Sequence, residues 1–291
     1  MTITDPAVAW RSRLGRHESF LVYGRFRYLK IACVAAAVSF LLYLVDSPYG
    51  FRYGGSWAGY TLGAAGALLI LWLMWFGYRK RSYLTDQGNL VAWLSAHVYL
   101  GLSLLVIATL HTGFHFGWNI HTLAYALMCL VIASGVFGVF SYVRYPQLMT
   151  ENRHGTTMPQ LLSRIASLND QLCTAAIGVD DRTAALVERS VKATSLGGTS
   201  WQQLAGHYPN CATAAALTDI AEVPTNGRPE LAAAMRQLRV LLHEKSQLLA
   251  RARQDIKYKA MMDIWLYFHV PLSFALLAAL LAHIIAVFYL W

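Results

Sequence analysis

The chain has 291 residues, of which 56% are hydrophobic and 13% are charged, and its mean hydropathy is +0.40. Soluble domains have about 25% charged residues, so this composition excludes an ordinary soluble protein. The net charge is +9 at pH 7, from 24 Lys and Arg against 15 Asp and Glu. Because the basic residues gather beside apolar stretches, this charge predicts membrane topology and argues against nucleic acid as a partner.

Five apolar stretches are long enough to cross a membrane, which takes about 20 helical residues. They predict an all-α membrane protein with spans at residues 28–45, 57–78, 90–113, 120–142 and 263–290. The expected domains are a basic N-terminal segment (1–27), four transmembrane helices (28–142), a helical insert (143–262) and a fifth transmembrane helix (263–291).

The basic residues also predict the orientation of the spans. Twenty-three of the 24 Lys and Arg residues lie before or at the start of the first span, between the second and third, or in the insert, and Arg52 alone lies on the other side. Basic segments stay in the cytoplasm. We therefore expect the N-terminus and the insert inside and the C-terminus outside, in the lipid of a bacterial-type inner (plasma) membrane.

The insert is predicted to be helical. MPQLLSRIASLNDQL and DRTAALVERSVKA have helical periodicity, and from Pro229 no helix breaker occurs before the fifth span, which predicts one long helix. There is neither a GxGxxG motif after a strand nor a P-loop, so nucleotide binding is not indicated. Since about 120 residues is long for a connecting loop, the insert is either a helical spacer or a docking platform for a cytoplasmic iron–sulfur or flavin redox protein.

Two of the spans carry histidines at one and the same spacing. HVYLGLSLLVIATLH runs from His97 to His111, and HVPLSFALLAALLAH runs from His269 to His283. Fourteen residues of α-helix turn through about 1400° and rise about 21 Å, so each pair shares one helix face. Because both spans are expected to cross the membrane in the same direction, His97 should lie at the depth of His269, and His111 at the depth of His283.

Paired imidazoles at equal depth predict haem. Histidine is a common axial ligand, and ionisable groups inside a membrane are costly and usually functional. We expect two b-type haems that make the helices a di-haem bundle: a cytoplasmic-side haem held by His97 and His269, and an outer-side haem held by His111 and His283. Such ligation leaves no open position on the iron, so these haems would transfer electrons. The alternative for any single histidine is a hydrogen bond to a neighbouring helix.

Small and basic residues near these histidines are further candidates for haem binding. Glycines leave room for a haem plane, although ordinary helix packing also explains them. Arginines can bind the haem propionates, although the positive-inside bias also explains them. The glycine candidates are Gly63 and Gly77, also fourteen residues apart, and Gly101, one turn from His97, with Gly135 and Gly138 in the fourth span. The arginine candidates on the cytoplasmic side are Arg79, Arg81, Arg144 and Arg153.

Two more histidines lie in or beside the outer loop that joins the third and fourth spans. His115 follows His111 by four residues, so it could replace His111 as a ligand or bind a quinone head group. Alternatively it is an interfacial residue of the aromatic belt, beside Phe116 and Trp118. The role of His121 stays open at this point.

Two parallel helices that each carry two histidines fourteen residues apart resemble the di-haem core of cytochrome b in respiratory quinol–cytochrome c reductases. The five spans also resemble the di-haem cytochrome b subunits of membrane nitrate reductases and related quinol-linked enzymes. The resemblance implies that the four paired histidines are the axial ligands and that quinone is a redox partner. The chain departs from the first family, which has eight spans and a PEWY motif that is absent here, and from the second, whose histidines are spaced differently.

The resulting expectation is the membrane cytochrome b subunit of an oxidoreductase complex, with electrons passing between a quinone pool and a redox protein on the insert. One alternative is a ferric-reductase-like transmembrane electron carrier without a quinone site. Another is a haem-free membrane scaffold or transporter, whose histidines relay protons or link helices.

Overall fold

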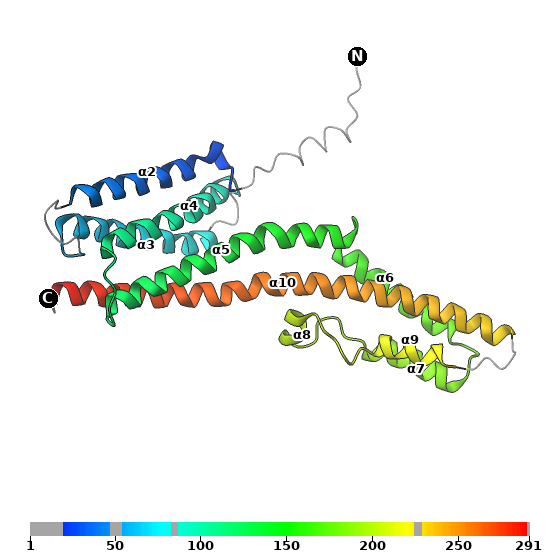
Figure 1. Ribbon diagram of the computed structural model, residues 1–291. Coiled ribbons are helices and arrows are strands. Elements are labelled where there is room, and N and C mark those ends of the chain that lie inside the picture. The colour runs from blue at the N-terminus through cyan, green and yellow to red at the C-terminus, as the bar shows by residue number, and fades with distance from the viewer. Residues whose placement is uncertain (1–19, 47–53, 83–86, 224–228, 290–291) are drawn as a thin grey trace, which may run out of the picture. The chain divides into compact units, whose positions relative to one another are not determined.

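The computed structural model describes residues 20–46, 54–82, 87–223 and 229–289, and these residues form an all-α protein (Figure 1). Five of its helices are long and apolar enough to cross a membrane, so the protein is a multi-pass membrane protein. They are α2 (Tyr23–Val45), α3 (Trp57–Ser82), α4 (Gln87–Thr112), α5 (Ile120–Arg153) and α10 (Pro229–Tyr289). The other described helices are α6 (Met158–Ala175), α7 (Asp181–Ala193), α8 (Ser200–Ala205) and α9 (Ala212–Ala221).

The five predicted spans coincide with these helices. Each predicted span lies inside one of them to within a single residue at its end. The prediction of one long helix from Pro229 into the fifth span is also confirmed, because α10 continues without interruption for 61 residues. Likewise α5 continues for eleven residues beyond the predicted end of the fourth span, to Arg153.

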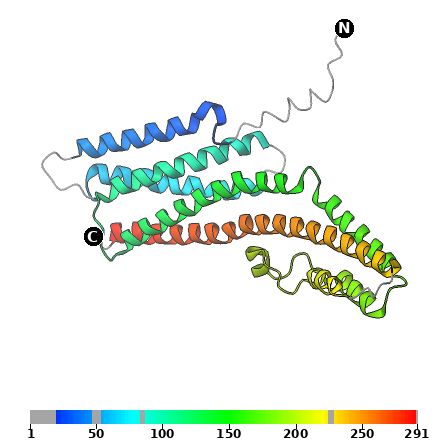
Figure 2. The same ribbon diagram turned by 45° about the vertical axis from the view of Figure 1, so that its right-hand side comes forward.

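The chain divides into two compact units. The first, which we call the membrane unit, consists of Met1–Val139 and Tyr267–Trp291, and the second, the insert unit, consists of Phe140–Leu266. In the membrane unit α2 and α3 both pack against α4. Figures 1 and 2 both show these three helices side by side, with the start of α5 running along the end of α10. The two ligand-bearing spans predicted from the sequence thus belong to one unit.

The insert unit has its own hydrophobic core. Its helices begin at defined caps: Thr157 and Gln160 form a capping box at α6, and the Asp180 carboxylate accepts from the Thr183 amide at α7. The core is made of side chains from α6, α7, α9 and the first part of α10, chiefly Leu168, Leu172, Val187, Ile220, Leu238 and Leu242. The amphipathic periodicity read in the insert sequence is confirmed as these buried helix faces.

Candidate functional site

The membrane unit is built in layers that repeat every seven residues. One layer consists of four buried apolar side chains from four helices, Ile70, Leu104, Met128 and Leu276. On α4, Leu104 stands seven residues from both His97 and His111, and on α10, Leu276 stands seven residues from both His269 and His283. Seven residues turn an α-helix through about 700° and advance it by about 10.5 Å, so they return to nearly the same face. This middle layer therefore separates two levels of histidines.

At one of these levels the imidazole of His111 is seated on α3. Its Nδ1 lies 2.7 Å from the carbonyl oxygen of Gly59. A carbonyl only accepts hydrogen bonds, so the proton is on Nδ1, and Nε2 of the neutral ring keeps a lone pair. The ring also lies directly on Gly63, where an added Cβ would stand 2.7 Å from His111 Cε1. Metal-bound histidines are commonly held in this way, with Nδ1–H donated to a backbone carbonyl.

His283 on α10 completes this level, which we call the His111 level. The ring centres of His111 and His283 are 6.0 Å apart, with the planes at 78°. With metal–nitrogen bonds of about 2 Å, two imidazoles on opposite sides of one metal ion have ring centres roughly 6 Å apart. The distance between the two rings is therefore compatible with their holding one metal ion between them.

His121, in the first turn of α5, joins the same level. Its Nδ1 lies 2.5 Å from Nδ1 of His283, and the two ring centres are 4.5 Å apart. The spacing of histidines in the sequence did not indicate this contact, because His121 stands alone on its helix. His115 does not take part: it is exposed, and its Nδ1 bonds to the Gly113 carbonyl within the same turn.

The second level, which we call the His97 level, brings together His97 and His269. They lie close enough to interact electrostatically. His97 is held by a hydrogen bond to the backbone of Leu73 and lies 5.0 Å from the ring of Phe76. Its Nδ1 is buried and has no hydrogen-bond partner among the described residues. A buried polar atom without a partner is unusual and needs an explanation, of which an absent ligand is one.

His269 is fixed by α5. Its Nδ1 lies 2.6 Å from Ser134 Oγ, while the Ser134 hydroxyl donates its only proton to the Val131 carbonyl, at 3.0 Å. With the hydroxyl proton on the Val131 carbonyl, Ser134 accepts Nδ1–H of His269, and the ring in that tautomer carries its lone pair on Nε2. Gly135, the next residue on α5, lies beside the same ring, because a Cβ added there would stand 3.6 Å from His269 Cε1.

The remaining candidates from the sequence have different surroundings. At Gly77 and Gly101 an added Cβ would meet nothing within 4 Å, and Gly77 is exposed, whereas the space over Gly63 is taken by the His111 ring. Arg144 is exposed and belongs to the insert unit. The structure gives Arg153 a structural role, since it forms an ion pair with the buried Asp255. The side chains of Arg79 and Arg81 lie outside the described residues, as does Arg52.

The donor set is suited to haem iron. The His97 level offers two imidazoles and the His111 level three, and within the described residues no group of three His, Cys, Asp or Glu side chains is arranged to hold a metal ion. Structural zinc sites need four ligands and calcium needs oxygens, so a pair of imidazoles alone satisfies neither metal. A bis-imidazole pair beside small residues fits an iron whose other four ligands come from a porphyrin.

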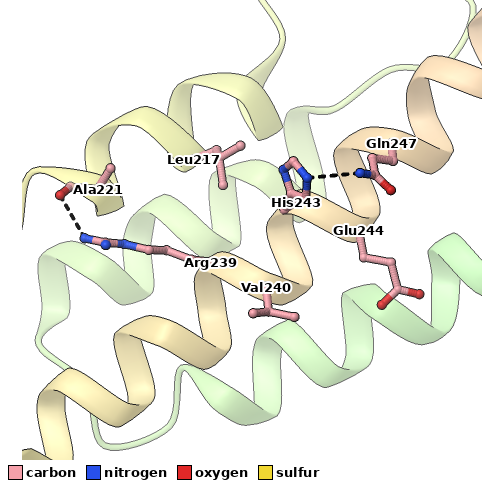
Figure 3. Close-up of a pocket in the computed structure, with 7 residues that line it drawn as sticks. All are labelled: Leu217, Ala221, Arg239, Val240, His243, Glu244 and Gln247. Atoms are coloured by element: carbon pink, nitrogen blue, oxygen red, sulfur yellow. Dashed lines mark hydrogen bonds between the residues drawn. The ribbon is translucent and has the colours of Figure 1, made fainter.

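The insert unit contains an open cavity of about 460 Å³ between α9 and α10 (Figure 3). Its polar side chains have structural partners: His243 bonds to Gln247, Glu244 pairs with Arg164, and Arg239 donates to the Ile220 and Ala221 carbonyls at the end of α9. These contacts stabilise the helices around the cavity and assemble no chemical group that acts on a ligand.

The sequence matches no protein-family model, and comparisons with curated proteins and with solved structures give no match.

Proposed function

We propose that this chain is the membrane cytochrome b subunit of an oxidoreductase and carries electrons across the membrane through two bis-histidine b haems. His97 and His269 would hold one haem, and His111 and His283 the other. The observation that carries this proposal is the pairing of His111 with His283, whose ring centres are 6.0 Å apart, with His97 and His269 near one another on the other side of one apolar layer.

When bound, haem iron supplies a one-electron couple, and the chain's residues decide what that couple does. Two imidazoles at each level would hold the iron, and a haem held by two histidines would supply electron transfer and not oxygen chemistry. Ile70, Leu104, Met128 and Leu276 form an apolar layer between the levels. His111 and His269 present Nε2 because Gly59 and Ser134 hold their Nδ1 atoms.

The proposal extends to direction and partners through the sequence. The distribution of Lys and Arg places the His97 level toward the cytoplasm and the His111 level toward the outside. On this basis quinone is the expected partner in the membrane, and a cytoplasmic iron–sulfur or flavin protein docked on residues 143–262 is the expected soluble partner. Quinol oxidation by the purified chain would separate this proposal from a ferric-reductase-like carrier without a quinone site.

The first test is a pyridine haemochrome assay with protein quantitation on the purified full chain. We expect about two b haems per chain in the natural protein and about one in His111→Ala and in His269→Ala, because each variant removes a ligand from one level. His115→Ala is the matched control and should keep both haems, since its imidazole bonds only within its own turn. A natural protein with no haem, or single variants that keep both haems, would disprove the proposal.

A further inference from the structure

The helix α5 carries none of the four proposed ligands, yet it contacts one of them at each level. Ser134 contacts His269, and His121 contacts His283. The two contact residues are thirteen positions apart on α5, and the two histidines are fourteen apart on α10. Along two helices that run side by side in opposite directions, nearly equal spacings keep both contacts in register. This match indicates that α5 has a role toward both levels.

The two contacts engage the same atom of the proposed ligand. In each, the atom of the proposed ligand that is engaged is Nδ1, at 2.6 Å from Ser134 Oγ and at 2.5 Å from His121 Nδ1. An imidazole that donates Nδ1–H keeps the lone pair on Nε2, and such a hydrogen bond makes Nε2 a better electron donor to a metal. At Ser134 the contact of the hydroxyl with the Val131 carbonyl favours this direction.

We propose that Ser134 and His121 are positioning residues, which accept Nδ1–H from His269 and His283 and so hold both rings with Nε2 toward the iron. This inference rests on the proposed function. It assigns α5 a part in each haem site: α4 and α10 supply the ligands, and α5 sets the orientation and donor strength of the two that lie on α10. His121, whose role the sequence left open, is thereby given one.

The first experiment measures the midpoint potential of each haem in Ser134→Ala by spectroelectrochemical titration of the purified full chain. Loss of the acceptor weakens the donor strength of His269, which favours ferrous iron, so the potential at the His97 level should rise. A tenfold change in the ratio of ferric to ferrous affinity corresponds to about 59 mV for one electron. The haem at the His111 level should keep its potential.

Two further variants separate positioning from general stability. Ser134→Thr keeps a hydroxyl and should restore the potential. Ser141→Ala makes the same change seven residues further along α5, at a buried serine whose Oγ has no partner among the described residues, and should leave both potentials unchanged. If Ser134→Ala and Ser141→Ala behave alike, or if Thr gives no rescue, Ser134 has no positioning role.

The second contact is tested at the other level. His121→Ala should change the midpoint potential and the low-spin electron paramagnetic resonance signal of the haem at the His111 level, whereas His121→Gln, whose amide oxygen accepts a hydrogen bond, should restore both. His115→Ala is the control in the neighbouring loop. Unchanged signals in His121→Ala would overturn the assignment of His121.

The two proposals fail in different ways. A natural protein that binds two haems but is insensitive to Ser134→Ala and His121→Ala would refute the positioning role and leave the proposed function intact. A natural protein without haem would refute the proposed function. In that case the ¹⁵N chemical shifts of histidine-labelled protein still test the contact between Ser134 and His269. His269 should be the Nδ1–H tautomer in the natural protein and a mixture of both tautomers in Ser134→Ala. A mixture of tautomers in both proteins would overturn the positioning role of Ser134.

Discussion

Leu104 on α4 and Leu276 on α10 lie in one packed layer, and each stands seven residues from both histidines of its own helix. Ile70 and Met128 complete the layer from α3 and α5. The same interval leads on α3 to Gly63 and Gly77, and on α5 to His121 and Gly135. On each of these four helices, positions seven residues apart therefore lie in turn at one histidine level, in the apolar layer and at the other histidine level. A heptad repeat keeps each helix facing its neighbours over this length.

Gly63→Ala should displace His111. The added Cβ would stand 2.7 Å from the ring carbon Cε1, so the imidazole must move and its hydrogen bond to the Gly59 carbonyl is lost. Because losing such a supporting contact typically lowers metal affinity about 10–100-fold, we expect haem loss at the His111 level alone. The haem content per chain reports it. Gly66→Ala is the control on the same helix, since its Cβ would meet Leu104 and Ile107 at 3.7 and 3.8 Å, an ordinary contact.

Leu104→Ala should destabilise the membrane unit. Leu104 is 3% exposed in the middle layer, whereas its neighbour Leu105 is 37% exposed. In a lipid-facing protein the truncation mainly removes packing, so we expect about 2 kcal/mol, the lower end for Leu→Ala in cores. Unfolding in mixed detergent and dodecyl sulfate micelles measures it. Leu105→Ala should have little effect, and equal losses from both variants would show that the middle layer is not packed as described.

Asp255→Ala should destabilise the insert unit more than Glu244→Ala. Asp255 is 1% exposed and binds both Arg153 and Asn152, whereas Glu244 pairs with Arg164 at the surface. Truncating one partner of a buried ion pair costs about 3–5 kcal/mol, and an exposed pair contributes about 1 kcal/mol or less. Hydrogen exchange of peptides from α6 and α7, read by mass spectrometry in the full chain, compares the two. A larger effect of Glu244→Ala would contradict the burial of Asp255.

The thiol of Cys211 should react at lower pH than an ordinary cysteine. Burial raises its pKa, but hydrogen bonds from the Ala214 backbone and from Arg253, together with the charge of Arg253, outweigh burial and bring the pKa below its usual value. The thiolate is the reactive form, so alkylation by iodoacetamide should reach its midpoint at a lower pH. Mass spectrometry follows this reaction, with the exposed Cys173 as internal reference. In Arg253→Gln the midpoint should move up; an unchanged midpoint would exclude Arg253 as a cause.

The arginines illustrate what sequence alone leaves open. Arg153 is a basic residue on the cytoplasmic side predicted from the sequence, as a propionate partner would be, and the structure instead pairs it with Asp255, 102 residues away. Gly63 and Gly77 are related by the spacing of the histidines, yet one lies under the His111 ring and the other faces open space. In each case the deciding neighbour comes from another helix, which a periodic pattern within one helix does not specify.

The sequence by itself determined the five spans, the continuous helix from Pro229 and the common face of each histidine pair, because hydropathy and helical periodicity are properties of a single segment. Only the tertiary structure decided that the Gly59 carbonyl accepts a hydrogen bond from His111, that Ser134 contacts His269 and that His121 meets His283. These contacts depend on which helices are neighbours and on their relative rotation. Both are set by packing over the whole bundle, where the middle layer of apolar side chains brings four helices together.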